Sequence, residues 1–160
     1  MRKQNLIIGL CTITVVALLF TAAAAQTSNA NPRFGQWKLK SDAAPPSSNI
    51  MSYEPFNGKG MKVTIDAVGN NGNKSQWYYT TMFDGKDETV TGNPGTDTGS
   101  VKIITDRINE ITYKKGGKVS QLLTNVLSPD GNTIGVMYMR MDADGKTTGV
   151  TFATYERIKN

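Results

Sequence analysis

Apolar and polar residues alternate in short segments from residue 34 to the end of the chain. Met61, Val63 and Ile65 share one face of one segment, and Trp77 and Tyr79 share one face of another. Successive side chains of a strand point to opposite faces, so this alternation is typical of strands with one face in a core and the other in water. No segment after the first 25 residues carries a convincing helical period.

Turn signals separate these segments at regular intervals. Asp84-Gly85, Lys115-Gly-Gly-Lys118 and Ser128-Pro-Asp-Gly131 are examples. Glycine adopts positive φ without a Cβ penalty, so such pairs suit the tight turns of hairpins. The pattern predicts strands over residues 34–40, 49–55, 60–68, 74–83, 88–91, 100–106, 108–115, 118–128, 133–142 and 147–158.

The predicted fold class is all-β, an up-and-down antiparallel barrel of eight to ten strands spanning residues 34–160 as one domain. An open sheet of this size would expose two unpaired edges, and closure into a barrel removes them. A β-sandwich is the alternative, but its crossovers need longer connections than these tight hairpins provide.

The first 25 residues have the pattern of a secretory signal peptide. Arg2 and Lys3 precede an uncharged apolar run over 6–20, and Ala23-Ala-Ala25 offers a cleavage site. Cleavage before Gln26 is expected, with cleavage after Ala30 and an uncleaved anchor as alternatives. Residues 26–33 would then be a flexible leader. We expect an exported protein, periplasmic or extracellular, with no stable membrane anchor and, because Cys11 is removed, no disulfide.

Composition excludes much of the common enzyme chemistry. The chain has no His, which removes nucleophile–imidazole pairs and imidazole metal ligands. Asp142-Ala-Asp-Gly145 starts like a calcium loop but lacks the later ligands, so a hairpin turn is the better interpretation. We therefore expect no enzyme activity, no cofactor and no metal.

Charge gives no indication of a nucleic-acid partner. The net charge of +5 falls to +3 once Arg2 and Lys3 are removed. The densest basic cluster, Lys114, Lys115 and Lys118, surrounds two glycines and is typical of a solvated hairpin tip. We expect a monomer that binds no nucleic acid.

The segment Gly35-Gln36-Trp37-Lys38-Leu39, the meander after it and Thr154-Tyr155-Glu156-Arg157 at the end resemble the lipocalin and fatty-acid-binding-protein superfamily. With its Asp-Gly-Lys turns, the chain is more closely similar to small secreted bacterial lipocalin-like proteins. The resemblance implies that Trp37 closes one barrel end, that Gly35 permits close approach, and that a basic residue of the last strand packs across Trp37. Arg157 is the first candidate for that residue and Arg140 the second.

Two departures from the superfamily bear on ligand binding. Fatty-acid-binding proteins hold a carboxylate with an Arg-x-Tyr pair on the last strand; here Tyr155 matches, but Ala153 replaces the Arg. Residues 41–48 are also too short and proline-rich for the two capping helices of that family. Fatty-acid binding by that mechanism is therefore not expected.

The interior face is ambiguous near the C-terminus. Ile134, Val136 and Tyr138 form one apolar row, and Met137, Met139 and Met141 form the other. A slip of one residue exchanges such rows. Because the first row includes Arg140, we expect the methionines inside. On the last strand the resemblance places Tyr155 inward with Thr151 and Ala153, whereas hydrophobicity alone favours Val150, Phe152 and Ile158.

The sequence thus favours a binding barrel for one small apolar or amphipathic ligand. The expected lining is Trp77, Tyr79, Met137, Met139 and Tyr155. The alternative is a structural or protein-interaction barrel with a filled core and no ligand, in which the same aromatic and methionine side chains are core packing.

Overall fold

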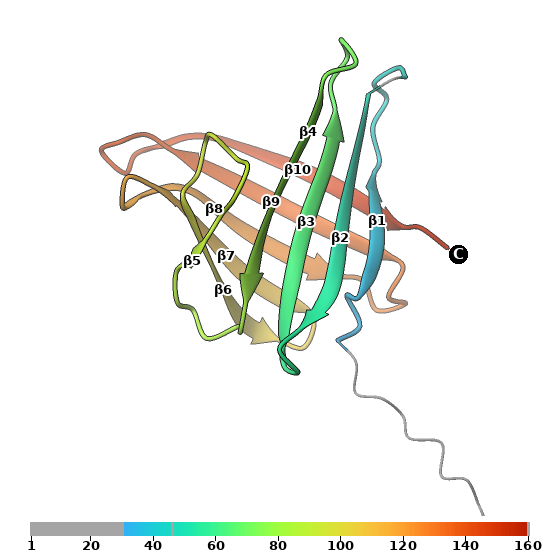
Figure 1. The fold of residues 1–160 in the computed structure, drawn as a ribbon, viewed down its shortest axis with the longest axis horizontal. Helices are drawn as coiled ribbons and strands as arrows, with labels where there is room; N and C mark the ends of the chain where they lie inside the picture. Colours follow the sequence, from blue (N-terminus) through green and yellow to red (C-terminus); the bar gives the residue numbers. More distant parts are fainter. Residues whose placement is uncertain (1–30, 46, 160) are drawn as a thin grey trace, which may run out of the picture.

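Ten antiparallel strands form a single sheet that curls into a barrel (Figure 1). The computed structural model describes residues 31–45 and 47–159, so the predicted signal peptide and most of the predicted leader lie outside the described residues. Within the described ranges no helix is long and apolar enough to cross a membrane. The strands are β1 Gly35–Leu39, β2 Ser48–Phe56, β3 Gly60–Val68, β4 Lys74–Thr81, β5 Glu88–Thr89, β6 Thr98–Thr105, β7 Ile108–Lys115, β8 Lys118–Leu127, β9 Thr133–Met141 and β10 Thr147–Arg157.

The topology is an up-and-down meander whose first and last strands also pair. The order is β4-β3-β2-β1-β10-β9-β8-β7-β6-β5, so β1 lies between β2 and β10. Each predicted strand is present, with its bounds within two residues of the expectation. The predicted all-β antiparallel barrel is confirmed. Local alternation and turn chemistry suffice for this because both depend only on near neighbours in sequence.

The barrel closes along a narrow seam between β4 and the segment after β5. The Tyr78 amide donates to the Thr91 carbonyl oxygen and the Thr91 amide donates to the Tyr78 oxygen, both at 2.9 Å. Gly92 follows with a φ of +87°, and a Cβ there would lie 2.4 Å from the Gln76 carbonyl oxygen. Glycine is therefore required for the two backbones to approach this closely.

The interior of β9 differs from the expectation. Ile134 and Val136 are 0% and 4% exposed and face inward, so Met137 and Met139 occupy the outer face. The prediction that the methionines point inside was wrong. Arg140 belongs to the inward row, and its charge was the reason for rejecting that row. It lies near the end of the strand and is exposed, so its guanidinium remains hydrated.

At Tyr155 and Ala153 the last strand follows the superfamily resemblance rather than hydrophobicity, whereas Thr151, which the resemblance also placed inward, is exposed. Tyr155 is 5% exposed and Ala153 packs against the core. Phe152 and Val150 point outward and are 78% and 45% exposed. Tyr155 thus lies inside the barrel, whereas the apolar side chain of Phe152 remains in water.

Trp37 and Arg157 lie at the end of the barrel where the N-terminal segment enters. Trp37 is fully buried, and the Arg157 guanidinium lies 4.1 Å from the centre of its ring. Arg157 also donates to the carbonyl oxygens of Phe34 and Gly131, each at 2.8 Å. A Cβ on Gly35 would approach the same guanidinium to 3.1 Å. Arg157, and not Arg140, therefore covers Trp37.

Arg33 belongs to this closed end, although the sequence placed it in the flexible leader. It is 2% exposed, and its carbonyl oxygen accepts the Trp37 indole N–H at 2.9 Å. Its guanidinium donates to Asn125 Oδ1 at 3.3 Å and to the Asp106 carbonyl oxygen at 3.2 Å. The folded domain thus begins before residue 34. The leader boundary was misplaced because a lone Arg among polar residues carries no sign of burial.

Candidate ligand-binding site

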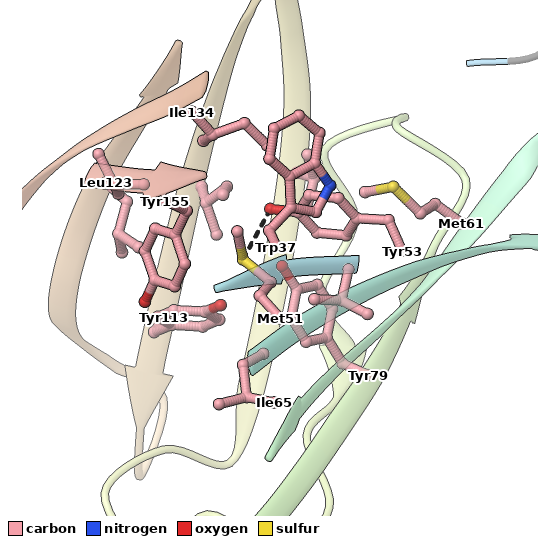
Figure 2. Packing of buried hydrophobic residues seen from close by; sticks show 14 of the residues in the cluster. Trp37, Met51, Tyr53, Met61, Ile65, Tyr79, Tyr113, Leu123, Ile134 and Tyr155 are labelled. Carbon is pink, nitrogen blue, oxygen red and sulfur yellow. Dashed lines mark hydrogen bonds between the residues drawn. The ribbon is translucent and has the colours of Figure 1, made fainter. Parts of the chain in front are cut away.

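A cavity of about 290 Å³ lies inside the barrel, between the closed end and the loops at the opposite end. Its walls are inward side chains of β2, β3, β4 and of β7 to β10, together with residues 93–96. Figure 2 shows several of these side chains, among them those of Tyr53, Tyr79 and Tyr155, converging from opposite walls of the barrel. The volume is near the lower limit of ordinary small-molecule sites, about 300 Å³. The interior is therefore not completely filled by its own side chains.

Three of the five predicted lining residues face this cavity. Trp77, Tyr79 and Tyr155 line it. Met137 and Met139 do not, because they lie on the outer face of β9. Their place is taken by Val136 and Tyr138, from the row that the sequence analysis rejected.

Tyr53 and Tyr113 are lining residues that the sequence analysis missed. Both carried a usable signal, because each shares its face with an apolar residue two positions earlier, Met51 and Ile111. The signal was weak, since a tyrosine fits either face of a half-buried strand.

Aromatic rings form one side of the cavity. Trp77 and Tyr79 are nearly parallel, at 15° with ring centres 6.2 Å apart. Tyr113 meets both of them edge-on, at 81° and 87° with centres 5.8 Å apart. Aromatic rings prefer offset stacking and edge contacts of this kind. The three rings therefore hold one another in fixed orientations.

Five tyrosines line the cavity, and the hydroxyl groups of three of them have polar contacts with other lining residues. Tyr53 donates to the Met51 sulfur at 2.9 Å (Figure 2). Its hydroxyl oxygen also accepts from Asn125 Nδ2 at 3.1 Å. The hydroxyl oxygens of Tyr138 and Tyr155 are 3.4 Å apart. These hydroxyl groups line the cavity and are held in place by contacts with neighbouring side chains.

Burial keeps the tyrosines protonated. Removal from water raises the pKa of Tyr79 to about 12, and it also raises the pKa values of Tyr53, Tyr113, Tyr138 and Tyr155. The cause is that a phenolate loses its hydration inside the barrel, whereas the neutral phenol loses little. At neutral pH each hydroxyl is a hydrogen-bond donor.

Among the described residues that line the cavity, none is Asp, Glu, Lys or Arg. The positively charged Arg33 does not line the cavity, but it donates to the amide oxygen of Asn125, which does. Burial lowers the pKa of the Arg33 guanidinium. The interior thus presents neutral donors and acceptors on an apolar and aromatic surface.

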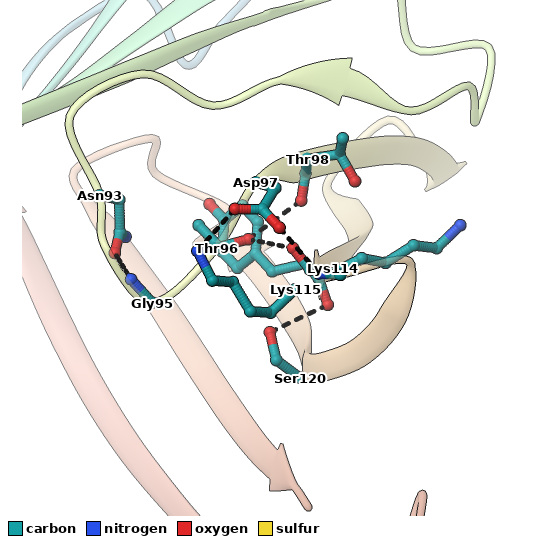
Figure 3. Close-up of polar contacts among 10 residues, drawn as sticks. Asn93, Gly95, Thr96, Asp97, Thr98, Lys114, Lys115 and Ser120 are labelled. Carbon is teal, nitrogen blue, oxygen red and sulfur yellow. Dashed lines mark hydrogen bonds and ion pairs between the residues drawn. The ribbon is translucent and has the colours of Figure 1, made fainter. Parts of the chain in front are cut away.

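The loop over residues 93–96 forms the rim and is fixed to the hairpin of β7 and β8 (Figure 3). The Thr96 hydroxyl donates to the Lys114 carbonyl oxygen at 2.9 Å, and Asp97 pairs with Lys115 at 2.7 Å. The Gly116 amide, which donates to Asp97, and the Lys115 ammonium lower the pKa of the Asp97 carboxyl. These contacts give the rim a defined shape.

No group of three or more His, Cys, Asp or Glu side chains that could hold a metal ion occurs in the described part of the chain. Asp142 instead accepts hydrogen bonds from the backbone amides of Asp144 and Lys146, at 3.0 and 2.9 Å. That arrangement is a closed turn stabilised by its own backbone.

Comparison with known proteins supports the fold. No family model matches the chain, and no curated protein matches it significantly in sequence. Among solved structures, the N57A mutant of the fluorescent protein UnaG is 15% identical, with a TM-score of 0.54 over 81% of this chain and 98% of that chain. Wild-type UnaG is 14% identical, with a TM-score of 0.52 over 78% and 96% of the two chains. The chain therefore shares the antiparallel β-barrel fold of these solved structures.

Proposed function

We propose that this protein is an exported barrel that binds one small apolar or amphipathic molecule, in the bacterial periplasm or outside the cell. The observation that carries the proposal is the internal cavity of about 290 Å³ with its aromatic wall. A structural barrel with a filled core would leave no such volume, because protein interiors are close-packed. Cavity volume therefore favours binding over the structural alternative.

The chemistry of the walls supports an apolar or amphipathic ligand. Val63, Ile65 and Leu123 join the aromatic rings at the cavity surface. Each Å² of apolar ligand surface that leaves water gains about 25 cal/mol. The small number of neutral polar groups would orient the ligand and select its functional groups.

Ligand retention and a blocked cavity test the binding part of the proposal. Native mass spectrometry of protein purified from its source is expected to show a bound small molecule. Leu123→Trp fills the cavity from β8 and is expected to abolish both that adduct and saturable binding of the neutral dye Nile red. Met139→Trp introduces the same side chain on the outer face and is expected to leave binding intact.

Melting temperatures of both variants show whether each barrel is folded. A folded wild-type barrel that carries no adduct and binds no probe would contradict the proposal. Equal loss of binding in Met139→Trp would also contradict it, because that side chain does not line the cavity.

Export rests on the signal-like segment over residues 1–25 and has its own test. Mass spectrometry of the protein from an expressing bacterium is expected to find a mature form that starts at Gln26 or Asn31. A mature protein that retains Met1 and stays in the cytoplasm would overturn this part and leave the binding part standing.

A further inference from the structure

The cavity wall indicates which class of small molecule this barrel would bind, an inference that rests on the proposed function. The described residues lining the cavity include no ionised side chain. A carboxylate or ammonium group taken into such a site loses its hydration and gains no opposite charge, which is costly. Arg33 does not line the cavity, and its guanidinium donates to Asn125 Oδ1 and to the Asp106 carbonyl oxygen, so it offers a ligand no direct ionic partner. The walls therefore favour an uncharged ligand.

The aromatic side of the cavity favours rings over flexible chains. Trp77 is only partly buried and is held between Tyr79 and the edge of Tyr113. A conjugated ring can make further stacking and edge contacts with this group, beyond the area that it buries. A flexible alkyl chain makes only dispersion contacts there and loses rotational freedom on binding.

Some hydroxyl donors inside the cavity have only a weak acceptor, or none, within the described part of the protein. Tyr53 donates to a thioether sulfur, which is a weak acceptor. Tyr138 and Tyr155 face each other, and only one of their two hydroxyl protons can lie between the two oxygens. A carbonyl or ether oxygen of a ligand would be a better acceptor for Tyr53 and for the remaining proton.

An acceptor is unused nearer the rim. Asn49 Oδ1 is buried on β2 at the cavity wall and has no hydrogen-bond partner. A buried acceptor left unpaired destabilises the folded protein, and a ligand N–H or O–H would remove that cost. A ligand that pairs with both groups would therefore carry a hydrogen-bond acceptor near the tyrosines and a hydrogen-bond donor near Asn49.

We infer that the ligand class is an uncharged, conjugated ring compound with an oxygen acceptor placed at the tyrosines and an N–H or O–H donor placed at Asn49. Such a molecule satisfies the unused groups at both ends of the cavity and contacts the aromatic side with its ring faces or edges.

Four probes test this inference by titration calorimetry at about pH 6. They are 7-hydroxycoumarin, its 3-carboxylate derivative, 7-methoxycoumarin and decanol. We expect 7-hydroxycoumarin to bind at least about tenfold more tightly than the charged derivative, which lacks an ionic partner, and than decanol, which lacks rings. The methoxy compound, without a donor, is expected to bind about tenfold more weakly as well.

Single substitutions test which residue pairs with each end of the ligand. Tyr53→Phe keeps the ring and removes the donor, so it is expected to weaken 7-hydroxycoumarin binding about tenfold. Tyr78→Phe makes the same change on an exposed tyrosine outside the cavity and is expected to have no effect. Asn49→Leu is expected to weaken 7-hydroxycoumarin but not 7-methoxycoumarin. Melting temperatures establish that each variant is folded.

The outcomes separate the inference from the proposed function. Tighter binding of decanol or of the carboxylate would overturn the inference while supporting a binding barrel. Failure of all four probes and of Nile red to bind folded wild-type protein would overturn both. Equal losses for the hydroxy and methoxy compounds in Asn49→Leu would remove Asn49 from its assigned role and overturn the donor part.

Discussion

At the scale of single residues, Arg157 makes several contacts that stabilise the closed end of the barrel. Its guanidinium covers the Trp37 ring and donates to three backbone carbonyl oxygens, those of Pro32, Phe34 and Gly131. Guanidinium geometry suits this combination, because the planar group stacks on the ring while its edges donate. One side chain therefore connects the N-terminal segment, the hairpin of β8 and β9, and the last strand.

Replacement of Arg157 by Ala is expected to lower the free energy of unfolding by about 2 kcal/mol, because the cation–π contact is lost and the partly buried carbonyl oxygens of Phe34 and Gly131 lose a donor. Arg140→Ala is the matched control, an exposed arginine at the other end of the barrel, expected to change stability by less than about 0.5 kcal/mol. Urea unfolding measures both. Similar values for the two variants would contradict the role of Arg157.

At the scale of the strand, the register of β9 decides which side chains reach the cavity. Ile134 is completely buried, whereas Met139 lies on the outer face and pairs with Leu122 on one side and Val150 on the other. Because both rows of β9 are apolar, its hydrophobicity does not distinguish the two registers.

A pair of alanine substitutions tests this register. Ile134→Ala is expected to lower the free energy of unfolding by about 3 kcal/mol, since it removes a fully buried side chain. Met139→Ala is expected to cost less than about 1 kcal/mol, because its site is partly exposed. Chemical denaturation ranks the two, and the reverse order would place the methionines inside.

The seam between β4 and the segment after β5 depends on the backbone at Gly92. Gly92→Ala is expected to lower the free energy of unfolding by at least about 2 kcal/mol, through its positive φ and through the contact with the Gln76 oxygen. Hydrogen exchange of the Tyr78 amide should accelerate in the variant, because that amide bonds across the seam.

Gly117→Ala separates the effect of the positive φ from the effect of the close contact. Gly117 also has a positive φ, +76°, but no atom lies within 4 Å of its Cβ position. Its substitution is expected to cost about 1 kcal/mol and to leave exchange at Tyr78 unchanged. Equal effects of the two substitutions would show that the seam does not require the close approach.

At the scale of the whole molecule, the tyrosines of the cavity make stability depend on alkaline pH. Their pKa values are raised in the folded barrel, to about 12 for Tyr79, above the ordinary value near 10. The folded state therefore holds protons that the unfolded state releases above about pH 10. This stabilisation is complete below pH 10 and is lost as pH rises through the folded pKa values.

Denaturant midpoints measured between about pH 8 and 12 are expected to be level at first and to fall above pH 10. Tyr79→Phe is expected to make this fall less steep, because one raised pKa is removed. Phenolate absorbance should rise together with unfolding. The absorbance is measured in the Tyr78→Phe variant, which removes the exposed tyrosine outside the cavity. A gradual rise of absorbance in that variant while it remains folded would contradict the raised pKa values.

The chain's local pattern determined the strands, the turns and the barrel class. Alternation over two residues and glycine-containing turns act between near neighbours, so the bounds of β3 and β7 follow from sequence without knowledge of the fold. The placement of Trp77, Tyr79 and Tyr155 inside also follows from alternation, or from the superfamily resemblance for Tyr155.

Only the tertiary structure decided which apolar row of β9 faces inward and which tyrosines meet in the cavity. Tyr53, Tyr113 and Tyr138 come from strands far apart in sequence, so their common site exists only once β1 has joined the two halves of the sheet. Likewise, the burial of Arg33 depends on Asn125 and Asp106, which lie more than 70 residues away. The physical reason is that strand alternation assigns side chains to two faces, but only pairing across the barrel determines which face encloses the cavity.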